Sequence, residues 1–160
     1  MLDADTAEKL LLLLEKSLGF YRDFLDLEKK KYEDLLSGRL EKLDGRLKRE
    51  QAFVLESRGL DRKRQKLMDQ TGNPRASFRE LLPDFPPEKR EKAESLYRGL
   101  SEVLFELKRA NARCQKMAKV RLNQVSRVLS KLGDSPELRR PYRESAKTDV
   151  RHSGLFSMKV

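Results

Sequence analysis

Residues 87–132 decide the fold, with the sequence PEKREKAESLYRGLSEVLFELKRANARCQKMAKVRLNQVSRVLSKL. Apolar side chains recur here at steps of four and three residues, as on a helix that is packed along its length. This seam consists of Leu96, Leu100, Leu104, Leu107, Asn111, Cys114, Ala118, Leu122, Val125, Leu129 and Leu132. Pro87 suits a first helical turn, and Gly133 with Pro136 suits a stop. We therefore predict a single helix, about 69 Å long at 1.5 Å per residue.

Two positions of the seam stand out. Asn111 is the polar interruption, which either fixes the register as a buried polar seam residue does or lies at the edge of the seam. The steps on both sides of Ala118 are four residues, a stutter that locally unwinds a left-handed supercoil. We expect the packing to change direction near Ala118.

Two further long helices are predicted upstream, over residues 5–37 and 39–70. Asp5 and Glu8 have the spacing of a capping box, which places the first start near Thr6. Ser37 and Gly38 form a short break, and short breaks between amphipathic helices favour an antiparallel hairpin. The second helix turns polar from Ser57 onward, so we expect weaker packing there. A short helix over residues 76–82 lies between prolines and could cover the open end of the hairpin.

The expected fold is all-α, an elongated antiparallel three-helix bundle made of a two-helix hairpin and a longer third helix. A helical domain would span residues 1–133. After Gly133 the periodicity is lost, and residues 134–160 are expected to form a flexible C-terminal tail.

Composition agrees with long amphipathic helices, since 38% of the residues are hydrophobic and 39% are charged. The single cysteine, Cys114, falls on the apolar seam and indicates a buried thiol in a reducing cytoplasm. Met1 is followed by acidic residues, so no signal peptide is expected. The run Leu10–Leu14 is far shorter than the roughly 20 residues that span a bilayer. No membrane insertion is predicted.

The predicted lengths place the candidate site at the C-terminal end of the third helix. The first two helices would measure roughly 50 and 46 Å, so the third would extend beyond them by about 20 Å. An uncovered apolar stripe is a surface on which a partner helix can bind. The candidate partner-binding residues are Ala118, Leu122, Val125, Val128, Leu129 and Leu132, with Tyr142, Leu155 and Phe156 from the tail. Alternatively, this apolar stripe is covered by a second copy of the chain or by the tail folding back onto it.

Three other classes of function compete with partner binding: an enzyme, a nucleic-acid-binding protein and a purely structural coiled-coil dimer. An enzyme is the poorest candidate, because the one histidine, His152, lies in the tail and no metal-ligand or phosphate-loop motif is present. No cofactor, metal or small-molecule substrate is therefore expected. Nucleic-acid binding is the serious rival, since the formal charge is +10. The basic residues that could line such a surface are Arg62, Lys63, Arg64, Lys66, Lys108, Arg109, Arg113, Lys116, Lys119 and Arg121. Aromatic residues do not interleave with them as stacking platforms would, which makes nucleic acid an unlikely partner.

The order of these elements resembles the FlgN family of cytoplasmic chaperones of the bacterial flagellum. The similar pieces are the leucine-rich first helix, the turn Leu35-Leu36-Ser37-Gly38 followed by Leu40 and Leu43, the segment Phe78-Arg79-Glu80-Leu81-Leu82, and the positions Leu104, Leu107, Asn111, Leu122, Val125 and Leu129. The resemblance covers about residues 8–133. Where the family often repeats asparagine three residues after the first, this chain has Cys114.

The resemblance implies a type III export chaperone. Its substrates would be hook-filament junction proteins, also called hook-associated proteins, bound through their C-terminal helical region and presented to the export apparatus. Export substrates that assemble through amphipathic helices need their apolar faces covered before export. A helical overhang and a tail that orders on binding can provide such a cover. Self-association as a homodimer remains an alternative use of the same face.

Overall fold

The structure is a computed structural model that describes residues 1–132. It is all-helical over those residues, as predicted. The elements are α1 (Ala4–Ser37), the 3₁₀ turn η1 (Leu40–Lys42), α2 (Leu43–Gln70), α3 (Phe78–Leu81), the 3₁₀ turn η2 (Leu82–Asp84) and α4 (Pro87–Lys131). The predicted tail from residue 134 lies outside the described residues.

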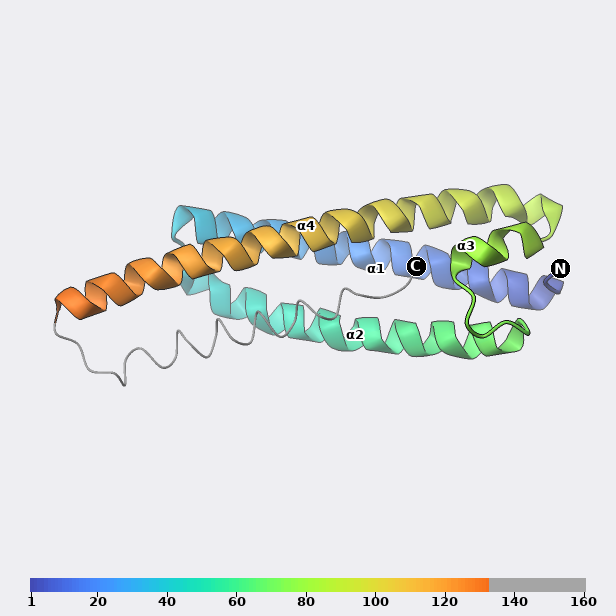
Figure 1. Cartoon of the computed structure of the whole chain (residues 1–160), viewed down its shortest axis with the longest axis horizontal. Helices are drawn as coiled ribbons and strands as arrows, with labels where there is room; N and C mark the ends of the chain where they lie inside the picture. Colours follow the sequence, from blue (N-terminus) through green and yellow to red (C-terminus); the bar gives the residue numbers. More distant parts are fainter. Residues whose placement is uncertain (133–160) are drawn as a thin grey trace.

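Helix α1 is the centre of the molecule. It packs against α4 along most of its length and against α2 on another side, whereas the backbones of α2 and α4 make few close approaches to each other. Figure 1 shows α1 and α4 running in one direction and α2 returning in the other. The wide apolar stripe of α1 explains this placement, because one helix that contacts two neighbours must bury two faces.

The start of α1 differs from the predicted capping box. Asp3 is the N-cap, and its Oδ1 accepts a hydrogen bond from the Thr6 backbone N–H at 2.9 Å. Asp5 instead pairs with Lys9, and Glu8 pairs with Lys89 of α4 at 2.6 Å. The helix therefore begins two residues before Thr6, because Asp3 reaches the free N–H groups of the first turn.

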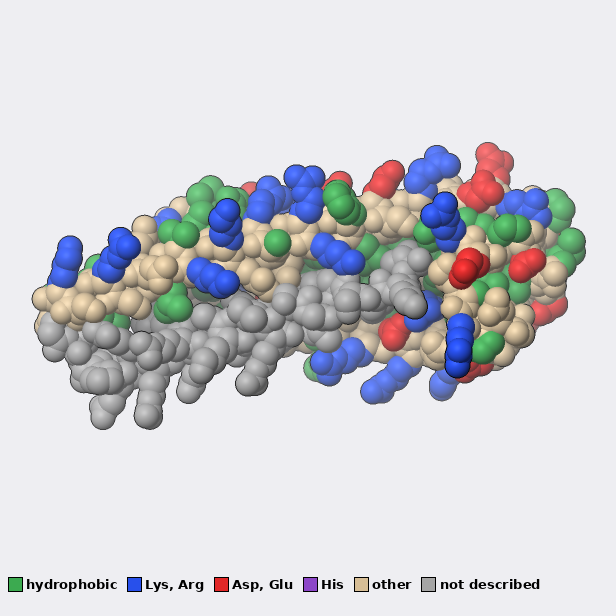
Figure 2. Space-filling model, viewed as in Figure 1, with side chains coloured by type: hydrophobic (Ala, Val, Ile, Leu, Met, Phe, Trp, Pro, Cys, Tyr) green, Lys and Arg blue, Asp and Glu red, His purple; other side chains and the backbone are tan. Residues whose placement is uncertain are grey.

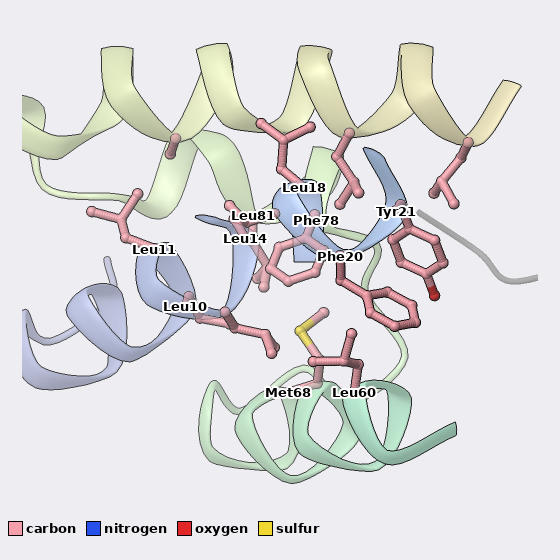
Figure 3. Packing of buried hydrophobic residues seen from close by; sticks show 14 of the residues in the cluster. Leu10, Leu11, Leu14, Leu18, Phe20, Tyr21, Leu60, Met68, Phe78 and Leu81 are labelled. Carbon is pink, nitrogen blue, oxygen red and sulfur yellow. The ribbon is translucent and has the colours of Figure 1, made fainter. Parts of the chain in front are cut away.

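The main core lies between the N-terminal half of α1, the C-terminal half of α2 and the first half of α4. Figure 3 shows Leu10, Leu14 and Phe20 of α1 pointing toward Met68 and Leu60 of α2. The rings of Phe20, Phe24 and Phe53 continue this core, with centroids 5.1–6.2 Å apart. The buried residues of the whole cluster are mostly leucine and phenylalanine, and the chain contains no tryptophan.

The short helix α3 closes the open end of the hairpin. Ser77 and Glu80 form a capping box in which each side chain accepts a hydrogen bond from the other residue's backbone N–H. Phe78 and Leu81 of α3 and Phe85 after η2 are buried in the core. The Leu2 backbone N–H donates to the Asp84 carbonyl at 2.7 Å, which ties the chain start to this cover.

Helix α2 is packed most loosely at its beginning, which is the opposite of the predicted weakness after Ser57. None of its residues before Glu50 is buried, whereas Leu60 and Met68 near its end are. The polar residues from Ser57 onward are satisfied locally, because Ser57 Oγ donates to the Val54 carbonyl and Arg64 pairs with Asp61. Local polarity therefore does not prevent this end of α2 from packing on α1.

Gly38 and Gly45 give a matched pair of stability predictions. Gly38 ends α1 with φ = 73°, a left-handed conformation that side chains with a Cβ disfavour. We expect Gly38→Ala to lower the free energy of unfolding by about 1–2 kcal/mol. Gly45 lies within α2, and the space that a Cβ would occupy there is open, so Gly45→Ala should raise it by about 0.5–1 kcal/mol. Urea unfolding followed by circular dichroism measures both, and a loss at Gly45 equal to that at Gly38 would contradict the backbone argument.

Candidate partner-binding site

The end of α1 is fixed to α4 by a single arginine. Arg121 Nε donates to the Leu35 carbonyl at 2.7 Å, and its Nη2 donates to the Leu36 carbonyl at 2.6 Å. These carbonyls belong to the last turn of α1, where backbone C=O groups have no N–H partner one turn further along the helix. Arg121 therefore caps α1 and lies where the packing of α1 against α4 ends.

Beyond Arg121, α4 continues alone for another ten residues to Lys131, about 15 Å of helix. Figure 1 shows this end of α4 projecting past the turn between α1 and α2. The prediction from helix lengths was about 20 Å, measured from an assumed alignment. The overhang in the structure is shorter because α4 has 45 residues and α1 has 34, a difference of 11 residues or about 16 Å. The two helices start near each other, where Lys89 contacts Glu8.

The predicted apolar residues of this end lie on one side of the overhang and are incompletely covered. Ala118, Leu122, Val125 and Leu129 are half-buried, while Val128 is 55% exposed and Leu132 is 75% exposed. No described residue of α4 after Cys114 is buried. Full burial therefore ends close to Ala118, the position of the stutter.

The structure places one further apolar residue beside this end. Leu36 is 53% exposed, and its carbonyl is held by Arg121. Leu36 was not predicted as a site residue because it lies off the repeating stripe of α1. Its position next to the Gly38 turn was the available signal. Tyr142, Leu155 and Phe156 of the predicted site lie outside the described residues, as does His152.

A buried polar cluster lies between the apolar core and the apolar end of α4. Glu28 and Lys31 of α1 and Glu50 of α2 are each at most 2% exposed. Lys31 Nζ lies 3.0 Å from both carboxylate oxygens of Glu50 and 3.2 Å from Glu28 Oε2. We call these three residues the buried ionic cluster. It was not predicted from the sequence, because charged residues that alternate along a helix are typical of solvent-exposed faces.

The cluster holds two carboxyl groups against one ammonium group. Burial raises the pKa of Glu28 to about 8, an effect that Lys31 opposes and the neighbouring Glu50 reinforces. With its pKa at about 8, the Glu28 carboxyl group keeps its proton at neutral pH, while Lys31 Nζ contacts both carboxylate oxygens of Glu50. The cluster is then close to neutral, which is the form that a buried site favours.

Cys114 and Asn111 of α4 lie on the seam in the same region. The Cys114 thiol is buried and donates to the Glu28 carbonyl at 3.3 Å. Burial, together with the nearby Glu28 carboxyl, raises the pKa of this thiol far above its ordinary value. Cys114 is thus a packed, unreactive thiol. Asn111 is 5% exposed, so it lies within the seam and not at its edge.

Neither a metal centre nor a membrane span is found in the part of the chain that the structure describes. Residues 1–132 contain no group of three or more histidine, cysteine, aspartate or glutamate residues placed to hold a metal ion. Among the same residues, no helix is both long and apolar enough to cross a bilayer.

These features define the class of the molecule: an elongated helical protein whose longest helix runs past its neighbours and exposes apolar side chains at its end. The family model described as FlgN protein matches residues 1–149, and the chain belongs to this family. Membership implies the role of a flagellar export chaperone. No curated protein and no solved structure gives a significant match.

Proposed function

We propose that this protein is a cytoplasmic chaperone that binds the C-terminal helical region of flagellar hook-associated proteins, prevents their premature assembly and delivers them to the export apparatus. The observation that carries the proposal is the apolar end of α4 beyond Arg121, in a chain that belongs to the FlgN family. An amphipathic substrate helix can cover this end without covalent chemistry. Tyr142, Leu155 and Phe156 are proposed to add to the same contact.

Val128 and Leu132 allow a direct test of the site, because both are largely exposed and their replacement should not disturb the core. We expect Val128→Asp combined with Leu132→Asp to weaken binding of a hook-associated C-terminal fragment from the same organism by roughly tenfold or more. Burying such side chains contributes about 1.5–3 kcal/mol each, and 1.4 kcal/mol corresponds to a factor of ten. Isothermal titration calorimetry measures the loss.

The matched control replaces Leu12 and Leu55, which are 55% and 66% exposed on α1 and α2, by aspartate. This control should leave the affinity within about threefold of the original value, which is less than 1 kcal/mol. Native binding should persist at high salt and show a negative heat-capacity change, as burial of apolar surface requires. Equal losses in both double variants would contradict the site. No measurable binding by the folded, unmodified chain would contradict the proposed function for that substrate.

Self-association is the alternative use of the same apolar end. If two copies covered each other there, the free protein would be a dimer, and Val128→Asp with Leu132→Asp would make it monomeric. Light scattering across a concentration series separates the two cases. The proposal requires a chain that is monomeric when free and that forms a complex with its substrate.

A further inference from the structure

The second half of α4 is strongly and uniformly basic. From Lys108 to Lys131 it carries eight lysine and arginine residues and no aspartate or glutamate. These are Lys108, Arg109, Arg113, Lys116, Lys119, Arg121, Arg127 and Lys131, all exposed except the half-buried Arg121. A 24-residue helical stretch with this composition extends about 35 Å.

This positive charge is not neutralised by the rest of the described structure. In the first half of α4, Lys89 pairs with Glu8 and Lys92 pairs with Glu15 of α1, both at 2.6 Å. None of the eight basic residues of the second half pairs with a carboxylate among residues 1–132. Figure 2 shows lysine and arginine side chains spaced along this half of the visible face, while acidic side chains gather toward the other end of the molecule. A charged surface of one sign favours a partner of the opposite sign.

The basic face also carries apolar side chains at helical spacing. Phe105 is 62% exposed and Val120 is 44% exposed. At 100° per residue, both lie on the side of α4 away from the buried Leu107 and Cys114, among Lys108, Arg109, Lys116 and Lys119. We call these six exposed residues, from Phe105 to Val120, the basic ridge.

Two guanidinium groups near the basic ridge are positioned by aromatic rings. Arg109 lies 5.8 Å from the centroid of the Phe105 ring, and Arg113 lies 5.6 Å from that of Tyr32 on α1. Stacking against a ring occupies the face of a guanidinium group and leaves its N–H edge for a carboxylate. These arginines are therefore partly ordered before any partner binds, which lowers the entropic penalty of forming bidentate contacts.

We infer that the basic ridge is a docking surface for an acidic amphipathic helix of another protein. Its four basic residues lie on one face of the helix between Phe105 and Val120, which stand 15 residues apart, about 22 Å. A second helix that carries glutamates and leucines at helical spacing can pair with these charges and cover the apolar residue at each end. The phosphate backbone of a nucleic-acid duplex would use the charges but would leave Phe105 and Val120 uncovered. An anionic membrane surface binds helices that offer a continuous apolar face, which the ridge lacks.

At 100° per residue, Val125 lies about 160° from the centre of the basic ridge around α4, and Leu122 and Leu129 lie about 100° and 120° from it, so the apolar end uses a different face of the helix. An acidic partner on the ridge and a substrate on the apolar end could therefore be bound at the same time. Because the two surfaces are different faces of the helix, binding at the ridge does not depend on the proposed function of the apolar end.

The test uses the full chain and a fluorescein-labelled synthetic helical peptide of glutamate, alanine and leucine, with glutamate and leucine at i, i+4 spacing. We expect binding in fluorescence anisotropy at low salt that weakens as salt is added. Lys108→Glu, Lys116→Glu and Lys119→Glu combined should reduce the affinity by roughly tenfold or more, since each reversal replaces an attraction by a repulsion. The same three lysines changed to glutamine should give an intermediate loss.

The matched control is Arg62→Glu, Lys63→Glu and Lys66→Glu on α2, which makes the same change in net charge at three exposed residues. The affinity of this control variant should stay within about threefold of the original value, because long-range charge has only a small effect in added salt. Equal loss in both triple variants would overturn the inference, since it would show attraction by net charge alone. Equal binding of a peptide of the same composition with two central prolines would also overturn it. Tighter binding to a DNA duplex, or to vesicles of phosphatidylglycerol and phosphatidylcholine, would assign the ridge to nucleic acid or to a membrane instead.

Discussion

Replacing Lys31 by methionine is expected to lower the free energy of unfolding by about 3–5 kcal/mol, because it removes the one cation from a buried site that holds two carboxyl groups. Lys31 is 2% exposed and contacts Glu50 at 3.0 Å. Methionine fills a similar volume, so the loss would report charge and not a cavity. Urea unfolding at pH 7, followed by circular dichroism, measures this effect.

Lys30→Met is the matched control for Lys31→Met. Lys30 is the next residue of α1, half-exposed, and pairs with Asp26 at 2.9 Å on the surface. A surface pair contributes about 0–1 kcal/mol, so this change should have little effect. Similar losses in the two variants would contradict the buried ionic cluster. Replacing Glu28, Lys31 and Glu50 together by leucine, methionine and leucine should recover most of the lost stability, since no buried charge is then left unpaired.

Replacing Glu28 by glutamine is expected to stabilise the protein at neutral and alkaline pH. The pKa of Glu28 is raised from 4.5 to about 8 in the folded chain, chiefly by burial, whereas the unfolded chain has the ordinary value. Between these two values the folded state binds a proton that the unfolded state has lost. Stability therefore falls as the pH rises from about 4.5 to about 8, and is constant above that range with respect to this group.

Glutamine resembles the protonated carboxyl group and does not titrate, so Glu28→Gln removes this loss of stability. The gain should be near zero at pH 4 and on the order of 3–5 kcal/mol at pH 8–9, at 1.36 kcal/mol for each unit of pKa shift. Unfolding midpoints measured in urea from pH 4 to pH 9 give the full curve. Glu33→Gln, on the exposed side of α1, should follow the unmodified chain throughout. A variant curve for Glu28→Gln parallel to the original would show that Glu28 is ionised in the folded protein.

The buried ionic cluster could have been anticipated in part. In the sequence, Glu28 falls in a gap of the α1 stripe between Leu25 and Tyr32, and Glu50 falls in a gap of the α2 seam between Leu47 and Val54. Both residues are 11 positions from Arg39, at the centre of the turn. An antiparallel hairpin therefore places the two gaps opposite each other. Neither gap is informative alone, because a single charge in a stripe more often lies at its edge.

Patterns that are local to one helix were readable from the sequence. The leucine seam of residues 87–132 identified α4, because burial along one face imposes a 3.6-residue period on any long helix. The turn at Gly38 was also readable, because a left-handed residue that ends a helix is usually glycine. The predicted weak end of α2 was wrong for the complementary reason: the polarity of Ser57 and Arg64 is satisfied by their own neighbours, which composition does not reveal.

Sequence patterns were sufficient to establish that the described chain is helical, where its long helices lie and that α4 is the longest of them. These features were readable because helix periodicity, caps and breakers act over a few residues. The packing of the helices, in contrast, sets which charges are buried, where α1 stops accompanying α4 and which face of α4 remains basic and unpaired. Those properties depend on how helices far apart in the sequence meet. The contact of Arg121 with the end of α1 spans 86 residues, and the same charged side chain on an isolated helix would have no carbonyl of α1 to cap.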